Sequence, residues 1–379
     1  MDEKGRLLPE SREELLKCTN CGFCQAACPV FSVTLRPAYN ARGKMLLLKE
    51  FLDGSIENPQ DIAESLFTCT TCQACTYSCP RSIKGADVVE SARRMLYERG
   101  CAPPQSLKVL DNIRETGNVF ASPVKDGMMA ERKEAADKAD VLVFMGCLPN
   151  FMDLKTIPSL LKVLGAAGVH YASLGSKEVC CGFPIILAGS DQFERHAEKV
   201  MSKIKATGAR QLVTPCTGCY RTFKHYYPRV GDMEVEILHS VEFIDRLMDE
   251  GRIKMRGRLK KKVTYHDPCD LGRASKIFRE PRKILEQIPE LHLVEMARNQ
   301  LNARCCGGGG GLQAHNRDLA LEMAKQRVRD ALEVGAEIIV SACPACKDNL
   351  RKGAQALPKE KRAGIKIMDI TEVVKQSLE

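Results

Sequence analysis

Two short cysteine runs near the start of the chain have a spacing that suits metal binding. Each run reads C-x2-C-x2-C-x3-C and is followed directly by proline. The first run is Cys18, Cys21, Cys24 and Cys28, and the second is Cys69, Cys72, Cys75 and Cys79. This is the spacing of two-cluster bacterial ferredoxins, in which the fourth cysteine of each run binds the other cluster. We therefore predict one [4Fe-4S] cluster bound by Cys18, Cys21, Cys24 and Cys79, and another bound by Cys69, Cys72, Cys75 and Cys28.

Zinc is the alternative occupant of these runs, because it is also bound by C-x2-C pairs. Zinc sites seldom use four cysteines in one such run, and this chain has two matched copies of the run. The pattern therefore favours iron–sulfur clusters.

The rest of the chain contains two further sets of five cysteines. Each set has a single cysteine, then an adjacent pair, then a C-x2-C pair. The first set is Cys147, Cys180, Cys181, Cys216 and Cys219, and the second is Cys269, Cys305, Cys306, Cys343 and Cys346. Glycine follows each adjacent pair, at Gly182 and Gly307, and permits a sharp turn that aims both sulfurs inward. We predict a metal cluster in each set, with a vicinal disulfide or a bare zinc site as the alternatives.

The composition agrees with metal-binding thiols in a globular protein. Of 379 residues, 44% are apolar and 28% are charged, and nineteen are cysteine. The charged start of the chain does not resemble a signal peptide, and no run of about 18 apolar residues predicts a membrane span. We therefore predict a cytoplasmic protein, with membrane association only through a partner. The nineteenth cysteine, Cys101, fits no motif and is predicted to be a structural thiol.

The net charge of +9 is spread along the chain, and its densest part is a basic run. That run comprises Arg252, Lys254, Arg256, Arg258, Lys260, Lys261 and Lys262. It is interpreted as a solvated linker, or as a surface that docks an acidic partner or an anionic membrane. Nucleic acid is not predicted as a partner, since no recognition motif accompanies the basic residues.

The cysteines fall into three blocks, and the first is predicted to be mostly helical. A capping-box pattern at Ser11 and Glu14 predicts a short helix that runs into Cys18. Further helices are predicted over Lys44–Leu52 and Val88–Arg99, each ended by glycine. This block is predicted to form a helical, ferredoxin-type domain with two clusters over residues 1–125.

The second and third blocks repeat one order of strands and helices. Strands are predicted at Val141–Met145, Val169–Ser173, Gln211–Thr214, at Val263, at Leu291–Glu295 and at Glu337–Val340. Helices are predicted near Leu154–Leu164, Gln192–Lys205, Ser275–Gln287 and Leu312–Glu333. Strands that alternate with helices favour an open parallel sheet in each block, and the cysteines follow the strand ends, where such sheets bind ligands. We predict an α+β multidomain chain whose second and third domains, residues 126–255 and 256–379, arose by internal duplication.

The repeated cysteine pattern resembles that of the cysteine-rich domains of CoB–CoM heterodisulfide reductase. The motifs that carry the resemblance are PCTGCY at 215–220, HDPCDLGR at 266–273 and CCGGGGG at 305–311. A duplicated copy behind two ferredoxin-type clusters resembles the one subunit of that enzyme in which both kinds of domain are fused. The resemblance implies two Rossmann-like α/β domains, each holding a noncubane [4Fe-4S] cluster through all five cysteines. The whole chain would then bind four clusters.

The resemblance also implies a reaction, the reduction of the mixed disulfide of coenzyme M and coenzyme B. The ten cysteines of the five-cysteine sets would be catalytic, and electrons would enter through the ferredoxin-type clusters from a b-type cytochrome, a flavoprotein or another redox partner. The alternative is a non-catalytic electron-transfer protein that serves a flavin-dependent 2-hydroxyacid or glycerol-3-phosphate dehydrogenase. Because both sets keep all five cysteines, we favour catalysis over simple electron transfer.

Three further features bear on the site. Asp270 follows Cys269, where relatives often have histidine, which puts a proton-donor role there in doubt. Cationic residues near the cysteines are candidates to line an anion-binding cavity. They are Arg221, Lys224, His225, Arg273, Arg304, His315 and Lys347. The run Gly307–Gly311 is predicted to let backbone pass close to a bulky group and to leave the second set more open to substrate. No nucleotide-binding motif is convincing.

Overall fold

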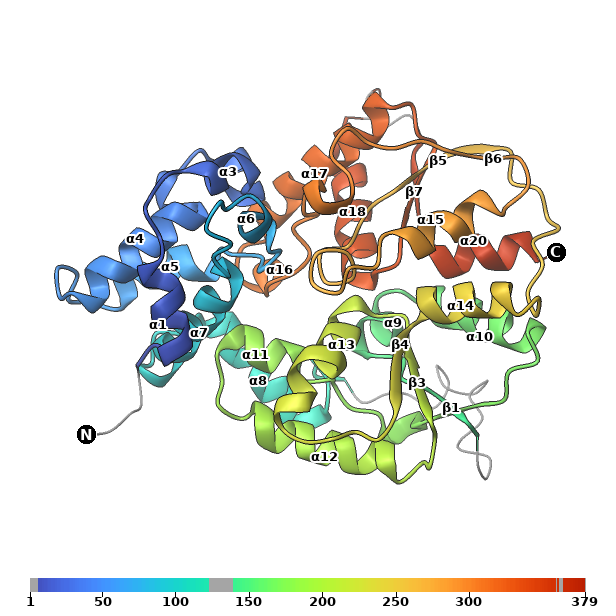
Figure 1. The fold of residues 1–379 in the computed structure, drawn as a ribbon, viewed down its shortest axis with the longest axis horizontal. Coiled ribbons are helices and arrows are strands. Elements are labelled where there is room, and N and C mark those ends of the chain that lie inside the picture. Colours follow the sequence, from blue (N-terminus) through green and yellow to red (C-terminus); the bar gives the residue numbers. More distant parts are fainter. Residues whose placement is uncertain (1–5, 123–138, 359, 361–363, 379) are drawn as a thin grey trace.

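The computed structural model describes residues 6–122, 139–358, 360 and 364–378. The predicted domain boundary at 125 and 126 lies outside these residues. A helical block lies at one end of the molecule and contacts two α/β blocks (Figure 1). The predicted combination of one helical and two α/β blocks is therefore confirmed, while the boundary at 255 and 256 stays a prediction.

The helical block consists of short helices with the two cysteine runs in the loops between them. Its elements are α1 (Pro9–Leu16), α2 (Phe23–Ala27), α3 (Pro29–Thr34), η1 (Pro37–Tyr39), α4 (Ala41–Leu52), α5 (Gln60–Phe67), α6 (Ala74–Tyr77), α7 (Gly85–Glu98) and α8 (Pro104–Thr116). Helices α1, α4, α5 and α7 share a small core that includes Leu15, Leu48, Leu66 and Met95. This core holds the cysteine loops in place.

The predicted capping box at Ser11 is wrong. Helix α1 begins one turn earlier, because Pro9, whose fixed φ suits a first helical position, follows Leu8 at the cap. Ser11 is buried inside the helix, and the Glu14 carboxylate accepts a hydrogen bond from the Lys84 amide at 2.9 Å. Glu14 therefore ties α1 to the start of α7.

The first α/β block is built on a four-stranded parallel sheet in the order β2-β1-β3-β4. Its elements are β1 (Val141–Val143), α9 (Cys147–Phe151), α10 (Thr156–Ala166), β2 (Tyr171–Ser173), η3 (Gly175–Lys177), α11 (Phe183–Ala188), α12 (Phe193–Lys205), β3 (Gln211–Thr214), α13 (Thr217–Arg221), η4 (Thr222–Tyr226), η5 (Tyr227–Arg229), β4 (Glu236–His239) and α14 (Ser240–Asp249). All residues of β1 are buried, as expected for a strand covered by helices on both faces.

The second α/β block has a parallel sheet in the equivalent order, β6-β5-β7-β8. Its elements are β5 (Lys261–Tyr265), α15 (Arg279–Glu286), β6 (Leu291–Leu293), η6 (Gln300–Asn302), α16 (Leu312–His315), α17 (Arg317–Glu333), β7 (Ile338–Ser341), α18 (Pro344–Ala356), β8 (Lys366–Asp369) and α20 (Ile370–Ser377). The predicted parallel sheets are confirmed. The duplication and the Rossmann-like assignment stay predictions.

Two details of the α/β blocks differ from the prediction. The helix predicted over Leu312–Glu333 is broken at Asn316, whose backbone leaves the helical conformation and whose side chain accepts a hydrogen bond from the Leu319 amide at 3.1 Å. The last strand of each sheet, β4 or β8, was not predicted, because each is only four residues long and starts with an exposed charged residue. The last two lysines of the basic run belong to β5.

The two α/β blocks pack against each other through equivalent helices. Helix α10 of the first block packs on α20 of the second, and α15 of the second packs on α14 of the first (Figure 1). In each sheet the strands are parallel, so their carboxyl ends lie at one edge. The cysteine loops therefore leave each sheet at a single edge. None of the described helices combines the length and the apolar character needed to cross a bilayer.

Candidate metal centres

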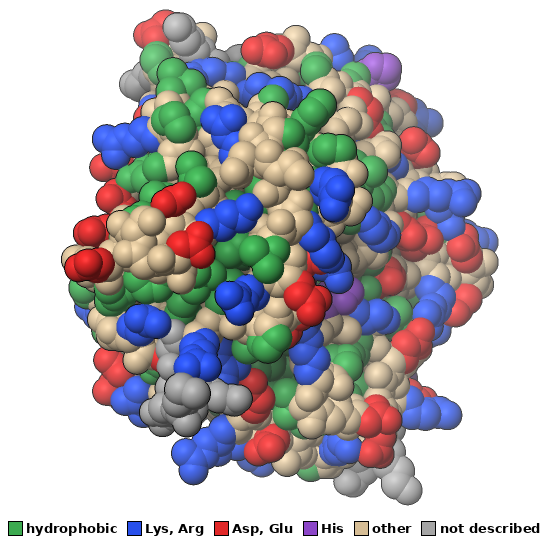
Figure 2. Space-filling model, turned by 60° about the vertical axis from the view of Figure 1, so that its left-hand side comes forward, with side chains coloured by type: hydrophobic (Ala, Val, Ile, Leu, Met, Phe, Trp, Pro, Cys, Tyr) green, Lys and Arg blue, Asp and Glu red, His purple; other side chains and the backbone are tan. Residues whose placement is uncertain are grey.

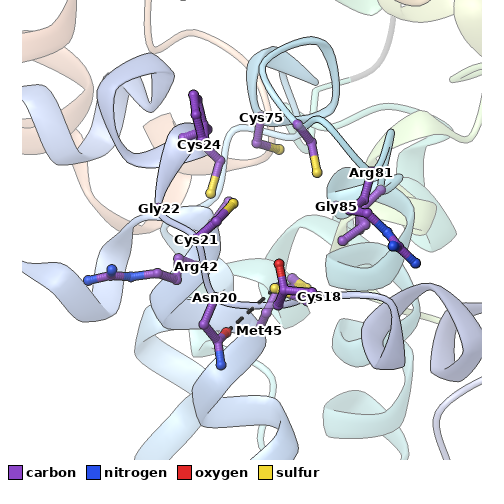
Figure 3. Close-up of a pocket in the computed structure, with 15 residues that line it drawn as sticks. Cys18, Asn20, Cys21, Gly22, Cys24, Arg42, Met45, Cys75, Arg81 and Gly85 are labelled. Carbon is purple, nitrogen blue, oxygen red and sulfur yellow. Dashed lines mark hydrogen bonds between the residues drawn. The ribbon is translucent and has the colours of Figure 1, made fainter.

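The first ferredoxin-type run and Cys79 line one cavity. Its walls include Cys18, Cys21, Cys24 and Cys79, and it encloses about 460 Å³ when the space open to solvent is counted. Figure 3 shows the labelled thiols of Cys18, Cys21 and Cys24 arranged around this space, with Arg81 at its rim. Cys21 is exposed, so this cavity reaches the surface of the protein.

The second run and Cys28 line a neighbouring cavity of about 420 Å³, measured in the same way. Cys28, Cys69, Cys72 and Cys75 all contribute to its walls, and Cys75 also lines the first cavity. The fourth cysteine of each run thus lies beside the other run, which is the arrangement that the predicted ligand assignment requires. The two cavities meet at Cys75.

Lys44 is a buried cation beside the second cavity that the sequence reasoning missed. Its ammonium donates hydrogen bonds to the Tyr39 carbonyl and, at 3.2 Å, to the Thr68 hydroxyl. Burial lowers the pKa of Lys44, while the nearby thiols of Cys69 and Cys28 act to raise it. Lys44 lies near the start of α4, and the sequence indicated no role for it beyond the first position of a predicted helix.

In the first α/β block, the five predicted cysteines come together. Their side chains form a chain of hydrogen bonds that runs Cys147, Cys180, Cys181, Cys219, Cys216. All except Cys147 are buried. The strands β1 and β3 deliver Cys147 and Cys216 just beyond their carboxyl ends, and a longer loop after β2 delivers the adjacent pair.

In the second α/β block, the equivalent chain runs Cys269, Cys305, Cys306, Cys346, Cys343. One further thiol joins it, since Cys72 of the helical block is hydrogen-bonded to Cys305. This contact lowers the pKa of Cys72. The second ferredoxin-type cavity therefore adjoins the second five-cysteine set.

The glycine after each adjacent pair makes the turn that the sequence predicted. Gly182 has φ +91° and Gly307 has φ +81°, a region that a side chain would strain. Their amides lie 3.4 Å from the sulfurs of Cys180 and Cys305, respectively. All nineteen cysteines are free thiols, so neither adjacent pair forms a vicinal disulfide.

Side chains from later elements anchor the backbone of the adjacent pairs. The Tyr227 hydroxyl donates to the Cys181 carbonyl at 3.0 Å, and the Asn349 amide donates to the Cys306 carbonyl at 2.7 Å. Because these donors are buried, they restrict the pairs to one orientation. Protein contacts alone therefore hold the thiols facing one another.

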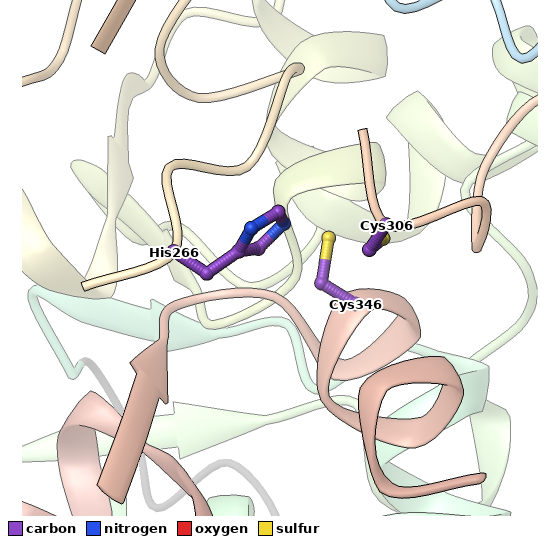
Figure 4. Close-up of side chains that lie close together, drawn as sticks. All are labelled: His266, Cys306 and Cys346. Atoms are coloured by element: carbon purple, nitrogen blue, oxygen red, sulfur yellow. The ribbon is translucent and has the colours of Figure 1, made fainter. Parts of the chain in front are cut away.

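His266 is a buried residue at the second set whose role the sequence reasoning missed. Its ring points toward the thiols of Cys306 and Cys346 (Figure 4), and one ring nitrogen and the two sulfurs all lie within 4.8 Å of one another. Its position three residues before Cys269 was the only signal in the sequence. Phe144 stands at the matching place in the first block.

The donor set in each of these four places fits an iron–sulfur cluster. Each place gathers at least four cysteine sulfurs, and thiolate is the ligand that such clusters require. Burial raises the pKa of Cys28 to about 11 and raises that of Cys75 well above its usual value. Buried thiolates without a cation are costly, and bound iron would remove that cost. A single zinc ion leaves the fifth thiol of the two larger sets without a partner.

Comparison with known proteins follows the same division of the chain. A family described as "4Fe-4S dicluster domain" matches residues 14–83, and one described as "Cysteine-rich domain" matches residues 141–224 and 263–351. The chain is 34% identical to one subunit of "Dihydromethanophenazine:CoB--CoM heterodisulfide reductase" of Methanosarcina acetivorans, over 96% of this chain and 94% of that protein. This chain belongs to the family of that heterodisulfide reductase subunit. It is thus a member of an iron–sulfur oxidoreductase family, as the resemblance predicted.

Other relatives share the same arrangement. One subunit of "Fumarate reductase (CoM/CoB)" of Methanothermobacter marburgensis is 30% identical over 97% of this chain and 74% of its own. A crystal structure of a hypothetical protein from Helicobacter pylori covers 98% of this chain and 73% of its own, with a TM-score of 0.58 and 10% identity, so it shares the fold alone. The similarity to the heterodisulfide reductase subunit and the shared fold both extend over nearly the whole chain.

In this family member, the cationic residues predicted to line an anion cavity have other partners. Buried Arg221 pairs with Glu90 at 2.9 Å and Asp270 at 3.0 Å, and buried Lys347 pairs with Asp153 at 2.6 Å and with Glu372. The prediction is wrong for these residues, because carboxylates already neutralise them.

The remaining candidates are likewise dispersed. Arg304 pairs with Asp330 at 3.4 Å, and His315 contacts the Phe67 carbonyl. His225 and Lys224 are exposed, and His225 lies 3.1 Å from the Ser275 hydroxyl. Of these candidates, Arg273 lies close to the thiols of Cys72, Cys269 and Cys305, and it donates to the Cys72 carbonyl at 2.6 Å.

The glycine run does not leave the second set more open, so that prediction is wrong. A Cβ at Gly310 would lie 2.4 Å from the Thr70 Cα, and one at Gly308 would lie 2.6 Å from the Ala345 carbonyl oxygen. The run instead allows the backbone of the helical block to pack directly against the second α/β block. The predicted close approach of the glycine backbone to a bulky group does occur. That group is the loop of the helical block that contains Cys69 and Thr70.

Arg93 contacts all three blocks, and no local pattern indicates this role. This fully buried side chain of α7 donates to the carbonyls of Cys69 at 2.6 Å, Leu187 at 3.2 Å and Gly310 at 2.9 Å. Five donors on a planar guanidinium suit several backbone acceptors at once. Arg93 thereby fixes the second ferredoxin-type loop against both α/β blocks. Cys101, by contrast, packs on the core of the helical block.

Proposed function

We propose that this chain is the catalytic subunit of a reductase that cleaves the heterodisulfide of coenzyme M and coenzyme B. The disulfide gains two electrons and two protons, its S–S bond breaks, and two thiols leave. A redox partner supplies the electrons. The relatives named for this reaction at 34% and 33% identity support the proposal.

The observation that carries the proposal is the direct connection between the two five-cysteine sets. Arg221, two residues after Cys219, bonds to Asp270, the residue after Cys269. Lys347, the residue after Cys346, bonds to Asp153 beside the helix that begins at Cys147. Each set is thus tied to the other at both sides, and helices α9 and α18, which begin at the two sets, are in contact. Such a pair of sets suits a substrate with two linked sulfurs.

We assign the ten cysteines of these sets as ligands of two noncubane [4Fe-4S] clusters, and the eight cysteines of the ferredoxin-type runs as ligands of two cubane clusters. Bound clusters would supply one-electron reduction and oxidation. The chain holds most thiols of the two five-cysteine sets buried and oriented, while the first ferredoxin-type run reaches the surface at Cys21.

The order of the sites gives a direction to electron transfer. Cys21 is exposed at the first cavity, Cys75 lines both cavities, and Cys72 of the second cavity contacts Cys305. We therefore place the docking face of the redox partner, a b-type cytochrome, a flavoprotein or another donor, around Cys21. Leu16 and Phe23, which lie close to Cys21 in the sequence, are exposed apolar side chains. Figure 2 shows hydrophobic side chains among lysines and arginines on the face that includes this end of the molecule.

The experiment supplies electrons to the whole, cluster-loaded protein and measures thiol release from the heterodisulfide. Wild-type protein is expected to release two thiols per disulfide, and Cys305→Ser and Cys306→Ser are expected to release none. Cys101→Ser is the matched control and is expected to retain full activity. A cluster-loaded wild-type protein that releases no thiol would favour the electron-transfer alternative, which the named relatives do not themselves favour.

A further inference from the structure

The two five-cysteine sets differ in one buried pair of side chains. His266 precedes Cys269 by three residues, and Phe144 precedes Cys147 by three residues. Arg327 in α17 and Val200 in α12 stand at the same distance before the glycine that follows each helix, Gly335 or Gly208. A polar pair in the second block therefore replaces an apolar pair in the first.

Arg327 determines which nitrogen of His266 carries the proton. The Arg327 Nε–H donates a hydrogen bond to His266 Nδ1 at 3.1 Å. A guanidinium has only donors, so Nδ1 must be the acceptor, and in a neutral ring the proton then lies on Nε2. The nitrogen left to face the thiols is therefore a donor.

The surroundings of this ring make its single donor effective. His266 is 1% exposed and Arg327 is 0% exposed, while the sulfurs it faces belong to buried cysteines. The sulfurs of Cys306 and Cys346 lie on that side, and the three ligand atoms are all within 4.8 Å of one another. Hydrogen bonds are stronger in such a water-free site. Phe144 offers no donor, and its ring packs on Phe223 with centroids 4.8 Å apart.

We propose that the Nε2–H of His266 donates a hydrogen bond to a cluster-ligating sulfur, Cys306 or Cys346, and makes the second cysteine-rich site the more easily reduced of the two. This inference rests on the proposed function, because it assumes a cluster at each set. Hydrogen bonds to cluster sulfurs help to set reduction potentials, and a donor stabilises the added negative charge of the reduced state. His266 is a positioning residue and does not itself bind iron.

The position of the second five-cysteine set gives this difference in ease of reduction a role in electron transfer. The second set is the one that contacts the ferredoxin-type thiols, through Cys72 and Cys305. A more easily reduced site at that point retains an arriving electron. The first set, which has Phe144 in place of the histidine, remains oxidised until the second electron arrives.

The test is a redox titration of the whole, cluster-loaded protein, followed by electron paramagnetic resonance of the two cysteine-rich sites. His266→Phe copies the residue of the first block and is expected to make reduction of the second site about tenfold less favourable, a shift of about 59 mV for one electron. His266→Gln keeps an amide donor and is expected to stay near the wild-type value. Phe144→Leu is the control for a changed core, and it is expected to leave the reduction potential of the second site unchanged.

A second readout covers the case in which His266→Phe fails to load its cluster. Double-resonance spectra of the reduced wild-type protein in H2O and D2O are expected to show an exchangeable proton coupled to the second site, and His266→Gln is expected to retain it. An unchanged potential in fully loaded His266→Phe would overturn the inference, and so would a strong nitrogen coupling typical of direct iron ligation. Failure of the proposed function would look different, as absent clusters or no thiol release from wild-type protein.

Discussion

The Cys72 side chain of the helical block is hydrogen-bonded to the Cys305 side chain of the second α/β block. These two thiols belong to different predicted clusters. Their contact makes the second ferredoxin-type cavity the neighbour of the second five-cysteine set.

Cys72→Ser is therefore expected to interrupt the path between the cavities and the second set. Iron should fall by about four atoms per chain, because one cluster loses a ligand. Reduction of the cysteine-rich sites by the redox partner should slow at least tenfold, as followed by rapid-freeze spectroscopy. Cys101→Ser is the control. An unchanged rate together with a full iron content would argue against this path.

Arg273→Met should loosen the junction between the helical block and the second α/β block. Arg273 donates to the carbonyls of Cys72 at 2.6 Å and Ala303 at 2.7 Å, and it is buried. Hydrogen bonds to charged groups contribute about 1.5–3 kcal/mol each, so we expect a loss of about 3 kcal/mol in the free energy of unfolding. Anaerobic denaturation by urea measures this change in the free energy of unfolding. The exposed Arg114→Met variant should change stability by no more than about 0.5 kcal/mol, and equal effects of the two substitutions would refute the assigned role.

Asp270→Ala should destabilise the junction of all three blocks. Asp270 and Glu90 together neutralise buried Arg221, and removal of one partner leaves part of a buried charge unpaired. Breaking a buried pair costs about 3–5 kcal/mol, whereas an exposed pair contributes about 0–1 kcal/mol. Asp140→Ala, which breaks the exposed pair with Arg210, is the matched control. If the two variants melt at the same temperature, the junction does not depend on this ion pair.

Acid should weaken the first α/β block through His239. Burial lowers the pKa of His239 to about 3, and its ring caps α14 by accepting the Val241 amide at 3.2 Å. The unfolded chain binds a proton near pH 6.5, so stability present above that pH is lost as the pH falls toward 3. At pH 5 the loss is about 2 kcal/mol.

His239→Asn keeps a capping side chain without the titration, and Asp369 plays the same capping role in α20. The variant should therefore lose less stability than wild type between pH 7 and pH 5, as measured by urea midpoints. The exposed His292→Asn variant is the control for loss of an imidazole. Parallel losses in wild type and His239→Asn would contradict this assignment.

Sequence patterns predicted the architecture because cysteine spacing and strand–helix order are local properties. The strands that precede Cys147, Cys216, Cys269 and Cys343 are short and buried at their carboxyl ends, and the structure has all of them. Strands β4 and β8 were missed because four residues are too few to show a clear alternation of apolar and polar residues. Helix α1 shows that a proline at the first position outweighs a capping-box match.

The contacts between blocks could not be predicted in this way. Arg93, Lys44 and His266 are polar residues that the pattern assigns to solvent or to no role, yet each is buried against cysteine loops from distant parts of the chain. Asp270 likewise has its partner, Arg221, in another block. Such partners depend on tertiary packing, which no local spacing encodes.

The metal content of the protein tests the central claim most directly, namely that eight cysteines in the ferredoxin-type runs and ten in the two larger sets bind iron. Strictly anaerobic protein should contain about sixteen iron atoms and about sixteen acid-labile sulfides per chain, the content of four [4Fe-4S] clusters. Colourless protein that contains zinc or no metal would contradict the account.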